Sequence, residues 1–358
     1  MAVRFDSALM RRIAITAGVL AAYRLAALLP LPGLDAEKIR GLMQIGGPVV
    51  GRASLMALGV IPLINALMLI EALRLIAPDV RRWEGAAPRN AGRLRSATLL
   101  VALLMALFQA IGIATALEGV SGLVPEPGLA FRLTIIATLV GGSAIAIAFA
   151  AIIDRAGIGS GVWLLFLAPA LAGLPRTFAT MAEYNAEGSY PAIAIVLGLL
   201  YVAIAIAAVV NILLAARGAA SVASAVVWTP IIANPLIVLL LVPFGLLLTS
   251  GLDGAVALAQ PGYPIWYATA VVAVTLLIWL YARSYAQAGA PMPLGVLPIA
   301  ASIAAILVAG SVLQSPIGVV LPLNGIETIL VATVGTKLLA DWGFVHWPAA
   351  GSAPESTP

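Results

Sequence analysis

The sequence predicts an all-α membrane protein built as a bundle of ten transmembrane helices. Ten separate runs of about twenty apolar residues occur along the 358 residues, and a helix of that length crosses the ~30 Å hydrocarbon core of a bilayer. Apolar residues make up 62% of the chain and charged residues 9%, and the mean hydropathy is +1.10. Soluble globular domains carry far more charge. The runs lie near residues 13–30, 57–76, 97–117, 133–153, 160–175, 190–214, 226–249, 264–282, 294–314 and 324–340.

Basic residues are distributed unevenly between alternate loops of this predicted bundle. Counted from the N-terminus, thirteen arginines and lysines fall on one side of the membrane and five on the other. Cytoplasmic loops carry the excess of basic residues in membrane proteins, so the pattern predicts an even number of spans and two cytoplasmic termini. These residues are split among membrane loops without interleaved aromatic residues, which argues against nucleic-acid binding.

The order of the runs suggests a division of the chain into two halves. Ten spans can divide as five plus five, the arrangement of an inverted repeat, which predicts an N-terminal half over 1–175 and a C-terminal half over 176–342. Residues 343–358 have no apolar periodicity and are predicted to form a disordered cytoplasmic tail. Prolines within several spans predict bent or broken helices; they are Pro62, Pro169, Pro230, Pro235, Pro243 and Pro298.

The composition also argues against several kinds of chemistry. The chain has no cysteine, so it has no disulfide, thiolate metal site or thiol redox centre. The glycine-rich stretch 157–161 has neither a preceding strand nor a following Lys-Ser/Thr pair, so a phosphate-binding loop is not expected there. No Ser/His/Asp grouping or pair of carboxylates suggests a common pocket. We therefore expect no enzyme activity, no cofactor and no metal.

Four ordered segments resemble spans of the SecY family, the pore subunits of the general secretory translocon. They are 11–35 (RRIAITAGVLAAYRLAALLPLPGLD), 51–71 (GRASLMALGVIPLINALMLIE), 93–117 (RLRSATLLVALLMALFQAIGIATAL) and 155–175 (RAGIGSGVWLLFLAPALAGLP). These are similar to the first, second, third and fifth family spans. Beyond residue 175 the resemblance rests on span count, spacing and short stretches such as WTPIIANP and LNGIETILV. The resemblance implies two pseudo-symmetric five-helix halves in the bacterial inner membrane, with a short plug-like segment at 36–50.

The resemblance also implies a constriction in the middle of the channel. A pore that passes polypeptides and excludes ions needs a narrow apolar waist, which seals by dewetting. In the family, residues of the second, fifth, seventh and tenth spans form this ring. Carried over to this sequence, the ring comprises Val60, Ile64, Val162, Phe166, Ile232 and Leu330.

Three amides correspond to polar positions of the family's lateral gate, between the second and third spans on one side and the seventh and eighth on the other. These residues are Asn65, Gln109 and Asn234. Amides there weaken apolar sealing and set how hydrophobic a segment must be to open the gate. Generic interhelical hydrogen bonding, worth ~0.6 kcal/mol for each residue, is the alternative.

Three charged residues fall within or next to predicted spans, where a charge costs ~2.5–3.5 kcal/mol on insertion scales and marks a bundle interior or water. Arg24 matches a family arginine and is expected to be structural. Glu71 stands where the family has a glutamine, near the cytoplasmic end of its span. Glu327 begins the last span and has no family counterpart. A location at the membrane interface and a proton or ion relay are both open for the glutamates.

Two functions from different classes fit these observations. One is a SecY-like channel that translocates or inserts polypeptides, clasped by a small SecE-like helix. The other is a transporter or scaffold derived from SecY that binds one hydrophobic client, and an inactive pseudo-translocon is a third possibility. The family's basic loops for ribosome or motor-ATPase docking correspond here to 215–225 and 283–293, each with one arginine. Docking of either is not expected.

Overall fold

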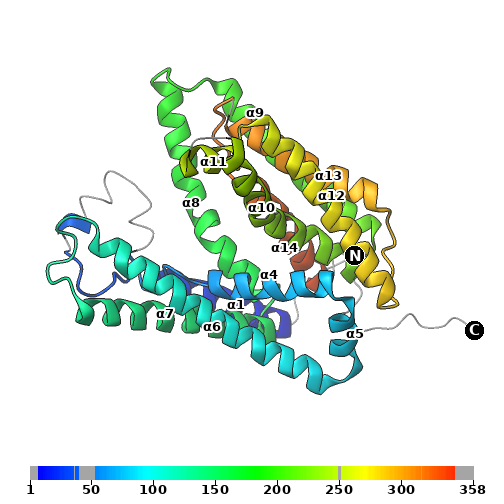
Figure 1. The fold of residues 1–358 in the computed structure, drawn as a ribbon, viewed down its shortest axis with the longest axis horizontal. Helices are drawn as coiled ribbons and strands as arrows, with labels where there is room; N and C mark the ends of the chain where they lie inside the picture. Colours follow the sequence, from blue (N-terminus) through cyan, green and yellow to red (C-terminus); the bar gives the residue numbers. More distant parts are fainter. Residues whose placement is uncertain (1–6, 36, 40–52, 249–250, 316, 343–358) are drawn as a thin grey trace, which may run out of the picture. The chain divides into compact units, whose positions relative to one another are not determined.

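A computed structural model describes residues 7–35, 37–39, 53–248, 251–315 and 317–342 (Figure 1). Within these ranges the regular secondary structure is helical, and an isolated antiparallel bridge joins Pro30 and Ser54. The all-α prediction is therefore confirmed. The predicted tail at 343–358 and most of the plug-like segment at 36–50 lie outside the described residues.

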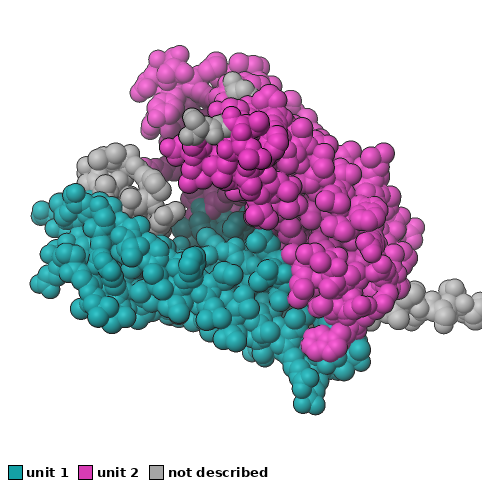
Figure 2. All heavy atoms as spheres, viewed as in Figure 1, with its two compact units in different colours: residues 1–70, 84–169 teal, residues 71–83, 170–358 magenta. Residues whose placement is uncertain are grey.

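The chain folds as two compact units, coloured separately in Figure 2. Unit 1 comprises Met1–Ile70 and Glu84–Pro169, and unit 2 comprises Glu71–Trp83 and Ala170–Pro358. The chain thus passes from one unit to the other inside three helices: α4 (Ile61–Ile76), α5 (Pro78–Ala86) and α8 (Gly161–Ala186). The predicted division at residue 175 into two pseudo-symmetric halves stays a prediction.

Unit 1 is organised around the pair α6 (Pro88–Glu118) and α7 (Leu129–Ala156). Small side chains recur every four residues along α6, at Ala102, Ala106, Ala110 and Ala114, and all are fully buried. Residues four apart share one helix face, and small residues on such a face let two helix backbones approach closely. Leu139 and Ile135 of α7 fill the space on the other side of this interface.

Polar contacts fix α1 and the turn before α4 within unit 1. Helix α1 (Ser7–Ala26) contacts the α7–α8 turn, where Ile158 donates its backbone N–H to Thr16 Oγ1 at 2.9 Å. Arg12 Nε also donates to the Gly157 carbonyl at 2.9 Å. On α7, the buried Ser143 donates its hydroxyl to the Gly59 carbonyl at 3.0 Å, so the turn before α4 is fixed against that helix.

Unit 2 is built around α10 (Ala220–Leu248), which packs against α11 (Leu252–Leu258), α12 (Pro264–Gln287) and α14 (Gly325–Asp341). Helix α10 continues through Pro230, Pro235 and Pro243. Helices α9 (Ala192–Ala215) and α13 (Val296–Gln314) are joined by the Tyr201 hydroxyl, which donates to the Ile306 carbonyl at 2.8 Å. These contacts give unit 2 a core of its own.

The predicted apolar runs each fall on a separate helix, but the count of ten spans is not confirmed by length and composition. Seven described helices are long and apolar enough to cross a membrane, and α4 with α5, bent by 106° at their junction, makes up to eight. Helix α1 carries three arginines, and α14 has 17 residues. Helix α8 extends to Ala186, well past the predicted end at 175, because residues 176–186 include many helix-forming side chains.

The close approach of α7 to the turn before α4 predicts a large difference between two adjacent glycines. A side chain at Gly142 would collide with the Leu55 carbonyl oxygen, whereas the space beside Gly141 is open. We expect Gly142→Ala to destabilise the protein by about 1–3 kcal/mol. Gly141→Ala is the matched control and should be neutral or slightly stabilising because alanine favours a helix. Thermal unfolding in detergent micelles measures both, and equal midpoints for the two variants would contradict the packing described here.

Candidate functional site

The six predicted constriction residues fall into two groups. Unit 1 contributes two buried residues, Val60 just before α4 and Ile64 in its first turn. It also contributes Val162 and Phe166, which are half-buried and one turn apart on α8. Val162 packs against the α4–α6 cluster formed by Leu63, Ala66 and Ala102. The structure therefore brings the beginnings of α4 and α8 together within unit 1.

Unit 2 contributes the other two constriction candidates. Ile232 lies on α10 and Leu330 on α14, and both side chains are buried. These two helices pack against each other. Each unit thus supplies apolar side chains from two of its own helices, and the closed ring of six residues stays a prediction.

The three gate amides lie in different surroundings. Asn65 on α4 and Gln109 on α6 are half-buried in unit 1. Asn234 on α10 is exposed and lines a cavity of about 190 Å³ within unit 2. Ser311, Gln314 and Asn324 contribute further polar groups to this cavity, beside apolar walls from α10, α12 and α13. Asn234 therefore lies in a largely apolar recess of its own unit that also holds a few other polar groups, and the gate role of the three amides stays a prediction.

Arg24 and Glu327 occupy helix ends. Arg24 is exposed in the last turn of α1, where a cation interacts favourably with the helix dipole. Glu327 belongs to a capping box: Asn324 Oδ1 accepts the Glu327 N–H at 2.9 Å, and Glu327 Oε2 accepts the Asn324 N–H at 3.0 Å. The Glu327 carboxylate therefore satisfies backbone groups at the start of α14.

Glu71 is at the centre of a buried charge cluster. Its side chain is 3% exposed and accepts hydrogen bonds from Arg74 Nη1 at 2.6 Å and Arg81 Nη2 at 3.0 Å. Arg81 Nε also donates to Ser284 Oγ on α12 at 3.2 Å, and its guanidinium lies 4.0 Å from the centre of the Tyr285 ring. A buried charge requires this kind of pairing, since removing it from water is costly.

The partner of Arg81 on α12 could not be identified from the sequence. Ser284 is 203 residues from Arg81 along the chain, and neither residue belongs to a recognisable motif. The available signal was a glutamate at the position of a family glutamine, followed by arginines three and ten residues later. That pattern indicates local ion pairing, but it does not indicate which helix the cluster binds.

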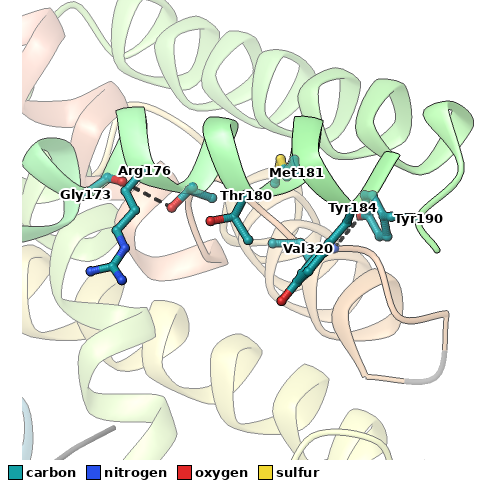
Figure 3. A pocket seen from close by; sticks show the side chains of 8 residues that line it. Gly173, Arg176, Thr180, Met181, Tyr184, Tyr190 and Val320 are labelled. Atoms are coloured by element: carbon teal, nitrogen blue, oxygen red, sulfur yellow. Dashed lines mark hydrogen bonds between the residues drawn. The ribbon is translucent and has the colours of Figure 1, made fainter. Parts of the chain in front are cut away.

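A groove of about 400 Å³ runs along the C-terminal half of α8 in unit 2 (Figure 3). Arg176, Thr180 and Tyr184 line it from α8, and Tyr190 and Val320 also contribute. The Val320 N–H donates to the Tyr190 hydroxyl at 2.7 Å and so fixes that end of the groove. Sequence analysis identified no site here. Among the described residues, no three His, Cys, Asp or Glu side chains form a group that could bind a metal ion.

These features define a multi-pass helical membrane protein with two compact units and with buried or half-buried apolar side chains at the candidate pore positions. The SecY family profile matches residues 54–284, which is more than half of the chain. The protein therefore belongs to the SecY family.

Two bacterial proteins are similar to this chain. The protein translocase subunit SecY of Buchnera aphidicola subsp. Acyrthosiphon kondoi is 33% identical over 197 residues, covering 50% of this chain and 55% of the relative. The protein translocase subunit SecY of Escherichia coli K12 is 31% identical over 195 residues, covering 50% of this chain and 44% of the relative. The chain thus aligns with about half the length of these relatives. Together with the apolar helices, they support an inner-membrane, multi-pass protein, whereas the cytoplasmic placement of the termini stays a prediction.

Solved structures with the same fold cover nearly the whole chain. Sec61 in the canine ribosome–channel complex from the endoplasmic reticulum matches with a TM-score of 0.62 and 14% identity, over 96% of this chain and 94% of the other. A SecY structure concerned with how the plug domain stabilises the closed channel matches with a TM-score of 0.61 at the same identity and coverage. At this identity the likeness establishes the fold alone, and it confirms the predicted SecY-like architecture.

The capping box predicts different outcomes for two substitutions at the start of α14. Asn324→Ala removes the acceptor for the Glu327 N–H, so we expect a loss of about 1 kcal/mol in stability. Glu327→Gln keeps an acceptor at the same place, because glutamine also serves in a capping box, and should leave stability nearly unchanged. Thermal unfolding in detergent tests both. A large loss for Glu327→Gln alone would show that the negative charge has a role beyond the cap.

Proposed function

We propose that this protein is a channel for polypeptides, which translocates them across the bacterial inner membrane or inserts them into it. The observation that carries the proposal is the family match over residues 54–284, which includes the segments containing Val60, Ile64, Val162 and Phe166. The likeness of the fold to a structure described as a protein-conducting channel gives further support, with a TM-score of 0.62. In this proposal the protein acts as a passage and not as an enzyme.

The proposed passage depends on an apolar waist. Val60, Ile64, Val162, Phe166, Ile232 and Leu330 would form it, and their aliphatic or aromatic side chains exclude water while deforming around a polypeptide. The lateral gate would open between α4 and α6 on one side and α10 and α12 on the other. Asn65, Gln109 and Asn234 would set how hydrophobic a client segment must be to open it.

The proposed partners are a polypeptide client, the lipid bilayer and a small SecE-like helix that clasps the halves 1–175 and 176–342. The connections that would have to contact a ribosome or motor ATPase are short. Helix α9 ends at Ala215 and α10 begins at Ala220, while α12 ends at Gln287 and α13 begins at Val296. These short connections also favour the second candidate function, a SecY-derived scaffold or transporter that serves one dedicated hydrophobic client.

Replacing two constriction residues with glycine should make the membrane leak. In the double variant Ile64→Gly/Val162→Gly, the waist loses two aliphatic side chains, so water enters and ions follow. The matched control Leu69→Gly/Leu171→Gly also replaces two aliphatic side chains with glycine, but at exposed positions of α4 and α8. Single-channel recording in planar bilayers should show conductance for the first variant and none beyond the parent for the second. If the constriction variant folds and inserts yet conducts no more than the parent, the channel proposal is wrong.

The short connections predict weak ribosome binding. Docking on ribosomal RNA requires several basic side chains on a projecting loop, but residues 216–219 and 288–295 contain a single arginine, Arg217. We expect the purified protein at micromolar concentration to stay in the supernatant when ribosomes are sedimented at physiological salt. Cosedimentation that persists at high salt would contradict this prediction and would favour a general translocon.

A further inference from the structure

Residues Glu71–Trp83 belong to unit 2, although the residues on both sides of them in the sequence belong to unit 1. The segment makes polar contacts with the last turns of α12. Arg81 Nε donates to Ser284 Oγ at 3.2 Å, and Arg82 Nε donates to the Gln287 carbonyl at 2.9 Å. Side chains therefore fasten the 71–83 segment to α12, while the backbone at either end continues into unit 1.

Glu71 orients the arginine that makes this connection. Its carboxylate accepts from Arg81 Nη2, which leaves Arg81 Nε free to reach Ser284 on α12. Ser284 is fully buried, and its hydroxyl donates to the Arg74 carbonyl at 3.1 Å. Removing one partner of this buried ion pair would leave an uncompensated charge. The contributions of Glu71 and Arg81 to the contact with α12 therefore depend on each other.

The contacts continue from α12 to α10. The guanidinium of Arg81 stacks over the ring of Tyr285, which adds a cation–π attraction. The Tyr285 hydroxyl donates in turn to Ser224 Oγ near the start of α10 at 3.0 Å. A continuous series of side chains thus runs from the end of α4 through α12 to α10.

We propose that Glu71, Arg81 and Ser284 form a latch that holds the end of α4 on α12 and keeps the lateral gate closed. This inference rests on the proposed function, in which α4 lies on one side of the gate and α10 and α12 lie on the other. Separating the two sides requires the latch to open, so its free energy adds to the cost of the open state. Glu71 is then a positioning residue that acts through Arg81.

The latch predicts that Glu71→Gln shifts the gating equilibrium. The amide keeps the size of the side chain but cannot neutralise Arg81, so the closed state loses its preferential stabilisation. We expect the fraction of time spent open in planar bilayers to rise about tenfold or more. The matched control is Asp79→Asn, which breaks the Arg82 ion pair of the same segment. Asp79 is 88% exposed, and surface pairs contribute little, so this variant should behave like the parent.

A double-mutant cycle separates a latch from a general loss of stability. If Glu71 acts by holding Arg81, the variant Glu71→Gln/Arg81→Gln should open no more than Arg81→Gln alone. Ser284→Ala, which removes the hydroxyl between Arg81 and the Arg74 carbonyl, should raise opening without placing an unpaired charge in the core. Additive effects in the cycle, or a Ser284→Ala variant with parental gating, would overturn the proposal.

Cross-linking provides the opposite test, because the chain has no cysteine of its own. Trp83→Cys and Gln287→Cys place thiols at exposed positions on the segment and on α12. A bifunctional methanethiosulfonate should block insertion of an apolar test segment into proteoliposomes, and a reducing agent should restore it. Normal activity while cross-linked would show that the segment is a fixed pivot, and the latch would be wrong.

The same thiols, spin-labelled, report the latch independently of conduction. Glu71→Gln should broaden the distance distribution between positions 83 and 287, whereas Asp79→Asn should leave it narrow. An unchanged distribution in Glu71→Gln overturns the latch.

If the constriction variant fails to conduct, the channel proposal fails and the latch fails with it. If that variant conducts but Glu71→Gln and the cross-link have no effect, the latch alone is wrong.

Discussion

The absence of water from the bilayer core is the constraint on which the rest of this structure depends. Without water, each backbone N–H and C=O must find a partner within the protein, and a helix supplies these partners from its own chain. The described spans are accordingly helical, and α10 remains a helix through three prolines. The same constraint explains why many polar side chains within the helices are hydrogen-bonded or paired. Threonines bond to carbonyls of the preceding turn, as Thr333 does to Ile329 at 2.8 Å, and Glu71 is paired with two arginines.

The hydrophobic effect gives little reason for one helix to prefer another in lipid, so close packing and polar contacts decide the arrangement. Helices α6 and α7 use the first means, with alanines on one face against branched side chains on the other. Helices α9 and α13 use the second, through the hydroxyl of Tyr201. The cluster around Glu71 combines polar contact with packing, because Arg81 pairs with Glu71 and its guanidinium stacks on the ring of Tyr285 on α12.

The fold class and the positions of the longer helices could be predicted from the sequence because both follow from the length and apolarity of single segments, whereas the short helices α5 and α11 lie outside the predicted runs. The family could be predicted because short sequence motifs, such as those at 51–71 and 155–175, resemble the corresponding spans of the family. The extension of α8 to Ala186 was missed, since apolarity marks the hydrocarbon and a helix continues into water wherever its residues allow. The link from Arg81 to Ser284 was also missed, because it depends on which helices meet. Glu327 was predicted as a membrane charge, and its bond to the Asn324 N–H shows how a local cap uses that carboxylate.

The separation of Arg81 from Ser284 along the chain has a consequence for biosynthesis. Ribosomes add roughly 5–20 residues each second, so Arg81 is made about 10–40 s before the serine that will accept its hydrogen bond, 203 residues later. During that interval α12 has not been synthesised, and the charged side chains of the segment lack their partner on that helix. The ion pairs of Glu71 with Arg74 and Arg81 lie within ten residues of sequence and need no distant helix. They can form as soon as the segment emerges, so charges of the nascent segment are compensated by local ion pairs before the rest of unit 2 is made.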